Sequence, residues 1–254
     1  MKRKRASTKK LQVIRCGSYE RRIIYYGGAA APDASPQQRR ARQLEGRHIS
    51  SEKKRLSNFR AAKNKFRALV YGNVTPEWSI VTLTYDNEHA PQNKKGVRPS
   101  WRQFSNLARR WANERGMDFK YFRVIEDKHG AGRPHIHLLC NIPISMREAF
   151  LTLWAFGCYE CQDMRQVDTD PGGNVDAEGL TRYLNKERRN LDERLYTTSR
   201  NLNKIEKLPP EPIPNETEIE DIALPENHYI LDRQEWRGLY GYIGAIDFIV
   251  PQRE

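Results

Sequence analysis

Hydrophobic positions along residues 78–194 change between two periods, and this change predicts a domain of mixed α and β structure. Apolar and β-branched residues follow strand-like patterns over residues 80–85, 119–126, 135–140 and 158–167. They recur at helical spacing after Ser100 and after Ser145, and a Gln or Glu three residues later completes a capping box in both cases. A last helix is predicted from Asp176 to about residue 194.

The predicted order is strand, helix, strand, strand, helix, strand, followed by one more helix. This is the split βαβ, ferredoxin-like arrangement of the α+β class. Its antiparallel sheet carries helices on one face, which leaves the other face for a catalytic site.

The segments outside this domain have other compositions. We expect residues 1–75 to form a basic DNA-binding arm, partly disordered and partly helical, with a short strand as an option at residues 21–26. Residues 76–205 form the predicted domain. Residues 206–228 are rich in Pro and acidic residues and predict a linker, and residues 229–254 predict a tail with one or two strands.

The charge is distributed unevenly along the chain. The net charge is +12, but residues 1–75 hold 20 Lys/Arg and 4 Asp/Glu, a net of +16. Such an excess attracts a polyanion, and nucleic acid is the first candidate. We expect DNA contacts in this arm from Arg39, Arg40, Lys53, Lys54 and Arg55.

Membrane and disulfide classes are not indicated. The chain has no run of 18 apolar residues, so we expect no membrane partner. Its four cysteines are spread unevenly, which favours a reducing compartment, and we expect the cytoplasm of a bacterial host. Cys158 and Cys161 are interpreted as ordinary strand cysteines.

Two histidines in the strand at residues 135–140 predict a metal site. His135 and His137 are two residues apart, so both side chains point to one face, with Ile136, Leu138 and Cys140 on the other. Glu126 ends the preceding strand and comes close to them if the two strands form a hairpin. Two imidazoles and one carboxylate suit Mg²⁺ or Mn²⁺ with open positions for a phosphate oxygen. Asp127 is the alternative third ligand.

A tyrosine on the last predicted helix is a candidate nucleophile. Tyr183 and Lys186 are three residues apart and share a helix face. A phenol with a pKa near 10 is a better leaving group than a sugar hydroxyl, so a phosphotyrosine bond is reversible. The ammonium group of Lys186 can stabilise the phenolate. A packed core tyrosine is the other interpretation.

Three motifs in this order, Val81–Tyr85, Arg133–His137 and Tyr183–Lys186, resemble those of HUH endonucleases. Over residues 78–205 the chain looks most like the rolling-circle replication initiators of small single-stranded DNA phages and related plasmids. The resemblance implies that His135 and His137 bind the metal and that Tyr183 is the nucleophile, and it places Glu126 as third ligand. The chain departs from two-tyrosine members, because no second tyrosine lies one helical turn from Tyr183.

The predicted function is therefore a metal-dependent single-strand DNA endonuclease and ligase that nicks a replication origin through a 5′-phosphotyrosine. Thr82, Thr84 and Arg133 are expected to contact origin DNA. A P-loop motif is missing from the sequence, so we expect a host helicase and a host DNA polymerase as partners. The alternatives are a transposase or mobilisation relaxase with the same chemistry, and a non-catalytic ferredoxin-like protein that stacks RNA bases on exposed aromatic residues.

Overall fold

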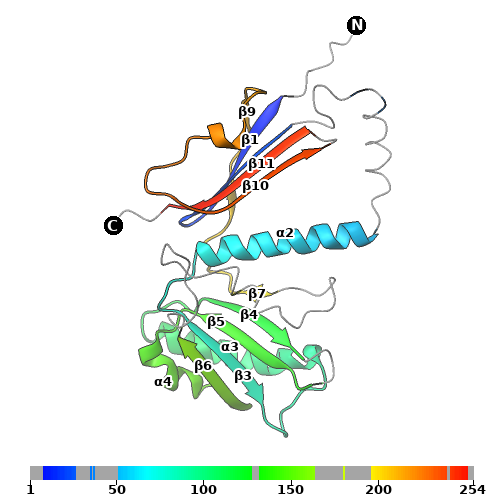
Figure 1. The fold of residues 1–254 in the computed structure, drawn as a ribbon. Helices are drawn as coiled ribbons and strands as arrows, with labels where there is room; N and C mark the ends of the chain where they lie inside the picture. Colours follow the sequence, from blue (N-terminus) through cyan, green and yellow to red (C-terminus); the bar gives the residue numbers. More distant parts are fainter. Residues whose placement is uncertain are drawn as a thin grey trace. The chain divides into compact units, whose positions relative to one another are not determined.

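A computed structural model of the chain describes residues 8–26, 51–127, 132–163, 196–238 and 241–250, and the single residues 35, 37 and 180 (Figure 1). The chain divides into two compact units. One unit comprises residues 58–203, and the other combines residues 1–57 with residues 204–254.

The unit of residues 58–203 contains a five-stranded antiparallel sheet. Its strands are β3 (Ser79–Tyr85), β4 (Tyr121–Glu126), β5 (His135–Cys140), β6 (Gly157–Asp163) and β7 (Thr197–Thr198). Their order is β6-β3-β5-β4-β7, and every neighbouring pair is antiparallel. The first four strands have the spatial order 4-1-3-2 of the split βαβ arrangement. The predicted fold class is confirmed.

Helices pack on one face of this sheet (Figure 1). Helix α3 (Arg98–Asn113) connects β3 to β4, and η3 (Ile144–Met146) with α4 (Arg147–Leu151) connects β5 to β6. Their apolar side chains form one core with alternate residues of the strands, which includes Trp101, Phe104, Ala108, Phe150, Val81, Leu83, Ile136, Leu138 and Cys140. The apolar side of the histidine strand is thus the predicted one.

Helix α3 begins two residues before the predicted start. It follows the short helix η1 (Lys94–Val97), and Pro99 lies in its first turn, where a missing N–H costs nothing. Ser100 therefore does not cap the helix. Its hydroxyl donates to the carbonyl oxygen of Val97 and lies 2.5 Å from the Tyr85 hydroxyl.

The other sheet face is not fully open, as the sequence had suggested it would be. Helix α2 (Ser51–Tyr71) places Phe66 against Phe122 of β4, with ring centroids 5.5 Å apart. Phe66 and Phe122 are both completely buried. The end of the segment predicted as a DNA-binding arm thus contributes to this core, because burying Phe66, Leu69 and Val70 stabilises the packed helix.

Gly157 allows the edge strand β6 to approach β3 closely. Its φ of +149° suits glycine, and a Cβ here would meet the carbonyl oxygen of Thr84. Along β6, Cys158 and Cys161 are three residues apart and lie on opposite sides of the strand, which fits ordinary strand cysteines rather than a joint metal or redox pair.

The unit of residues 1–57 and 204–254 contains a second antiparallel sheet. Its strands are β1 (Lys9–Cys16), β2 (Tyr19–Tyr26), β8 (Glu206–Lys207), β9 (Glu211–Ile213), β10 (Tyr229–Gly238) and β11 (Gly241–Ile249). The order is β10-β11-β2-β1-β8, and β9 also pairs with β1. The β1–β2 hairpin is therefore internal, with C-terminal strands on both sides.

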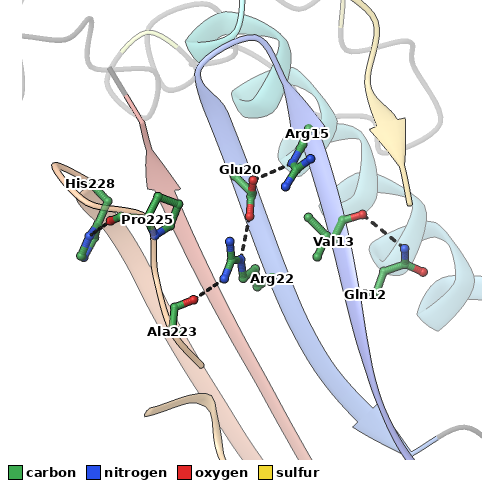
Figure 2. Close-up of polar contacts among 8 residues, drawn as sticks. All are labelled: Gln12, Val13, Arg15, Glu20, Arg22, Ala223, Pro225 and His228. Carbon is green, nitrogen blue, oxygen red and sulfur yellow. Dashed lines mark hydrogen bonds and ion pairs between the residues drawn. The ribbon is translucent and has the colours of Figure 1, made fainter. Parts of the chain in front are cut away.

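Buried contacts hold this second sheet together. Ile24 and Phe248 form its core with Ile219 of the short helix η5 (Ile219–Asp221). Glu20 is buried, and its carboxylate accepts from Arg15 at 2.7 Å and from Arg22 at 2.6 Å (Figure 2). Arg22 also donates to the carbonyl oxygen of Ala223, which ties the region predicted as a linker to β2 (Figure 2).

The N-terminal region thus differs from the arm expected from its charge. Lys9–Tyr26 is a paired hairpin rather than a disordered segment, and the stretches expected as linker and tail supply four strands. Local patterns could not show this, because the partner strands lie about 200 residues away and loop closure over such a distance leaves no local signal. No helix in the described ranges is long and apolar enough to cross a membrane.

Candidate active site

Three neighbouring strands bring the predicted metal ligands to one sheet face. Thr84 of β3 and Glu126 of β4 lie on either side of His135 of β5 in one row across the sheet. In the next row, Thr82 lies opposite His137. Since alternate residues share a face, all five side chains project from the face opposite to α3.

Two threonine hydroxyls hold the two imidazoles. Thr82 Oγ1 lies 3.2 Å from Nδ1 of His137, and Thr84 Oγ1 lies 3.1 Å from Nδ1 of His135. A hydrogen bond at one ring nitrogen fixes the orientation of the imidazole and selects the other nitrogen for metal binding. The two Nε2 atoms are therefore the candidate metal donors. The sequence had assigned Thr82 and Thr84 to DNA contacts. Their matching two-residue spacing on the neighbouring strand was the signal that could have indicated this pairing.

Glu126 joins the histidines through a buried contact. Its Oε2 lies 2.9 Å from Nε2 of His137, and both residues are 7% exposed. Its other oxygen, Oε1, is buried without a hydrogen-bond partner. A buried carboxylate oxygen without a partner costs free energy, which a cation could recover.

The donor set fits a divalent metal. As the side chains stand, no group of three His, Cys, Asp or Glu in the described part of the chain could hold an ion. However, Glu126 lies opposite His135 and in contact with His137, and its Oε1 is unsatisfied. Two imidazoles and one carboxylate are the donors expected for Mn²⁺ and related ions.

Asp127, the alternative third ligand, belongs to another contact. Its carboxylate lies 3.4 Å from Nζ of Lys94. Of the two acidic residues, Glu126 is the one that touches a candidate histidine.

The structure describes only part of the other predicted site. Arg133 is exposed, and its guanidinium donates to Asn87 Oδ1 in the loop after β3. Arg55 is exposed on α2, and Lys53 and Lys54 belong to the same helix. Tyr183, Lys186, Arg39 and Arg40 lie outside the described residues.

Tyr196, the nearest described tyrosine after Tyr183, has the surroundings of a core residue. Its ring packs against Phe66 at 4.8 Å and Phe122 at 6.4 Å between centroids. Burial raises the pKa of Tyr196 to about 12. A phenol that is harder to ionise is a weaker nucleophile, so Tyr196 is disfavoured as a substitute for Tyr183.

The histidine face does not form an aromatic platform for RNA bases. Phe122 is the aromatic residue of β3, β4 and β5 on this face, and it is completely buried beneath α2. Base stacking needs exposed rings. The described strands therefore do not favour the non-catalytic base-stacking alternative.

Residues 78–189 match a family model, that of the replication-associated protein ORF2. The match supports a protein like the initiators of rolling-circle replication. The matched range begins just before β3 and includes Glu126, His135, His137 and Tyr183. No curated protein and no solved structure matches the chain.

Proposed function

We propose that this initiator-like protein is a metal-dependent endonuclease that nicks one DNA strand at a replication origin and later rejoins it. The observation that carries the proposal is the buried Glu126–His137 contact beside His135, with both histidines held through Nδ1 by threonines. The replication-associated family match supplies the biological context.

Glu126, His135 and His137 would hold Mg²⁺ or Mn²⁺. A bound ion of this kind polarises a scissile phosphate and offsets its negative charge. Thr82 and Thr84 would keep each Nε2 directed toward the ion, so the threonines act as positioning residues. Exposed Arg133, just before the same strand, would contact the DNA backbone.

Tyr183 would be the nucleophile. Its phenolic oxygen attacks the scissile phosphorus, the bond from phosphorus to the 3′ oxygen breaks, and a 5′-phosphotyrosine forms. The leaving oxygen takes up a proton and becomes the free 3′-OH that primes synthesis. Lys186 stabilises the phenolate before attack. The reverse step, attack by a 3′-OH on the phosphotyrosine, closes the DNA circle and restores the phenol.

This function implies three partners. The substrate is single-stranded origin DNA, and synthesis from the 3′-OH requires a DNA polymerase. Because the sequence contains no P-loop motif, a host helicase would unwind the duplex. These partners place the protein in the cytoplasm of a bacterial host, with the gene on a phage or plasmid.

A covalent-capture experiment tests the proposal and does not require the origin sequence. Protein is incubated with Mn²⁺ and a single-stranded DNA library with a random core, and adducts that survive denaturing electrophoresis are sequenced. We expect an adduct that retains a 3′ label, releases a 5′ label and yields one enriched junction sequence. Tyr183→Phe should form no adduct, whereas Tyr196→Phe, the matched control, should form it as wild type does. Cleavage without an adduct would mean that water is the nucleophile and would refute the proposal.

A further inference from the structure

The outer surface of α3 is a strongly cationic patch on the sheet face opposite to the histidines. Helical spacing places its exposed residues on one continuous arc, namely Arg98, Pro99, Arg102, Gln103, Asn106, Arg109, Arg110 and Asn113. The inward side of the same helix carries the buried Trp101, Phe104 and Ala108.

No negative charge balances these arginines locally. Residues 94–113 contain six Lys/Arg and no Asp or Glu. In the described structure, Arg98, Arg102, Arg109 and Arg110 take part in no ion pair, and Arg109 donates only to Asn106 Oδ1 at 3.3 Å. An ordinary solvated helix face mixes charges of both signs, and this one does not.

This patch was hidden in the charge totals. Residues 76–254 have a net charge of −4, so the composition assigned the basic excess to the N-terminal region alone. Folding separates the charges, because the helical period gathers the arginines of α3 on one exposed face.

We propose that this α3 face binds double-stranded DNA in the major groove. Arg, Gln and Asn, the residue types that fill the arc, are those that contact phosphates and read guanine and adenine edges. An α-helix with its side chains fits the major groove. A hollow of about 760 Å³ lies along the first turns, lined by Arg98, Pro99, Arg102, Gln103 and Asn106.

Duplex DNA fits this face better than a single strand does. Proteins that hold single strands without base pairing stack the bases on exposed aromatic rings. The aromatic residues of α3, Trp101, Phe104 and Trp111, are all buried in the core. The face therefore offers charge and hydrogen-bond donors but no stacking platform.

The surface goes beyond the proposed nicking chemistry. The histidines and Glu126 lie on the other face of the same sheet, so duplex binding and strand cleavage would use separate surfaces of one unit. Duplex DNA beside the origin would be held on α3 while the unwound strand reaches the histidine face.

Salt-dependent binding tests this inference. Fluorescence anisotropy is measured with a short mixed-sequence duplex and a single strand of equal length, in EDTA so that no cleavage is expected. Arg102→Gln/Arg109→Gln should weaken duplex binding on the order of tenfold and reduce the slope of log affinity against log salt by about 2. The control Lys204→Gln/Lys207→Gln removes the same charge from exposed positions outside α3 and should change the slope much less.

Two results would overturn the inference. One is an equal slope change in the α3 pair and the control pair, which would indicate a general charge effect. The other is a loss confined to the single strand. Arg98→Gln/Arg110→Gln must reproduce the effect, with unchanged melting temperatures in both pairs. Because the assay excludes cleavage, its result is independent of the covalent-capture test.

Discussion

Glu126 Oε2 lies 2.9 Å from Nε2 of His137, and both residues are almost fully buried. The second carboxylate oxygen, Oε1, is also buried and has no hydrogen-bond partner. Two strands are needed for this arrangement: Glu126 ends β4, and its side chain reaches diagonally to β5. A cation between these groups would satisfy the unpaired oxygen.

The first prediction concerns metal binding by Glu126. Mn²⁺ at about 100 times its Kd should stabilise wild type by about 2.7 kcal/mol, because binding to the folded state adds to the free energy of unfolding. Glu126→Gln should lose most of this gain, measured as the shift in melting temperature with Mn²⁺. Asp127→Asn is the matched control and should keep the shift, because Asp127 contacts Lys94. Equal shifts in all three proteins would exclude Glu126 as a ligand.

The second prediction concerns the threonines that hold the histidines. Thr82→Val and Thr84→Val keep the β-branched shape but remove the hydroxyl at Nδ1. Metal affinity should fall about 10–100-fold, as is typical when the partner of a ligating histidine is lost. Isothermal titration with Mn²⁺ measures this change.

The control for the threonine variants is Thr197→Val. Thr197 Oγ1 also accepts a hydrogen bond in this sheet, from Arg123 Nε at 3.0 Å, but it does not contact a histidine. Its metal affinity should equal that of wild type. Unchanged affinity in Thr82→Val and Thr84→Val would show that the hydroxyls do not position the imidazoles.

The third prediction separates DNA binding by the N-terminus from its structural role. Deleting residues 1–7 removes Lys2, Arg3, Lys4 and Arg5 and should reduce the salt slope of DNA binding while leaving the melting temperature unchanged. Deleting residues 1–60 removes the internal β1–β2 hairpin and should unfold the second sheet. Circular dichroism and thermal melting distinguish the two deletions. Equal stability of both would contradict the pairing of β2 with β11.

The fourth prediction concerns pH. Burial raises the pKa of Tyr196 from 10.0 to about 12, so the folded state favours the neutral phenol. The resulting stabilisation is complete below pH 10 and is lost as the pH rises through about 12. Tyr196→Phe should show a weaker loss of stability over this range than wild type, measured by urea unfolding at several pH values. An identical pH dependence in the two proteins would mean that Tyr196 ionises normally.

Much of the histidine domain could be predicted from local patterns. Alternation in Ile80–Tyr85 and His135–Cys140 identified both strands, and the sides of the histidine strand were assigned correctly. The two helices between strands followed from apolar residues at helical spacing. These predictions succeeded because each depends on the few residues within one element, whose period is fixed by backbone geometry.

The charge pattern was a less reliable guide. The excess of Lys and Arg in residues 1–75 suggested a separate arm, yet Lys9 is buried and bonded to the carbonyl oxygen of Thr217, and Phe66 lies in a core. Charge indicates what a segment attracts, but it does not show whether the segment is also paired in a sheet.

By itself, the sequence determined the elements of the histidine domain, their order, and the face that carries His135 and His137. Only the tertiary structure decided that Thr82 and Thr84 hold these histidines, that Glu126 rather than Asp127 touches one of them, and that the first hairpin joins the last strands. The physical reason is the range of the interactions. Backbone periodicity acts within a few residues, whereas strand register and side-chain contacts join positions that are 11 to more than 200 residues apart.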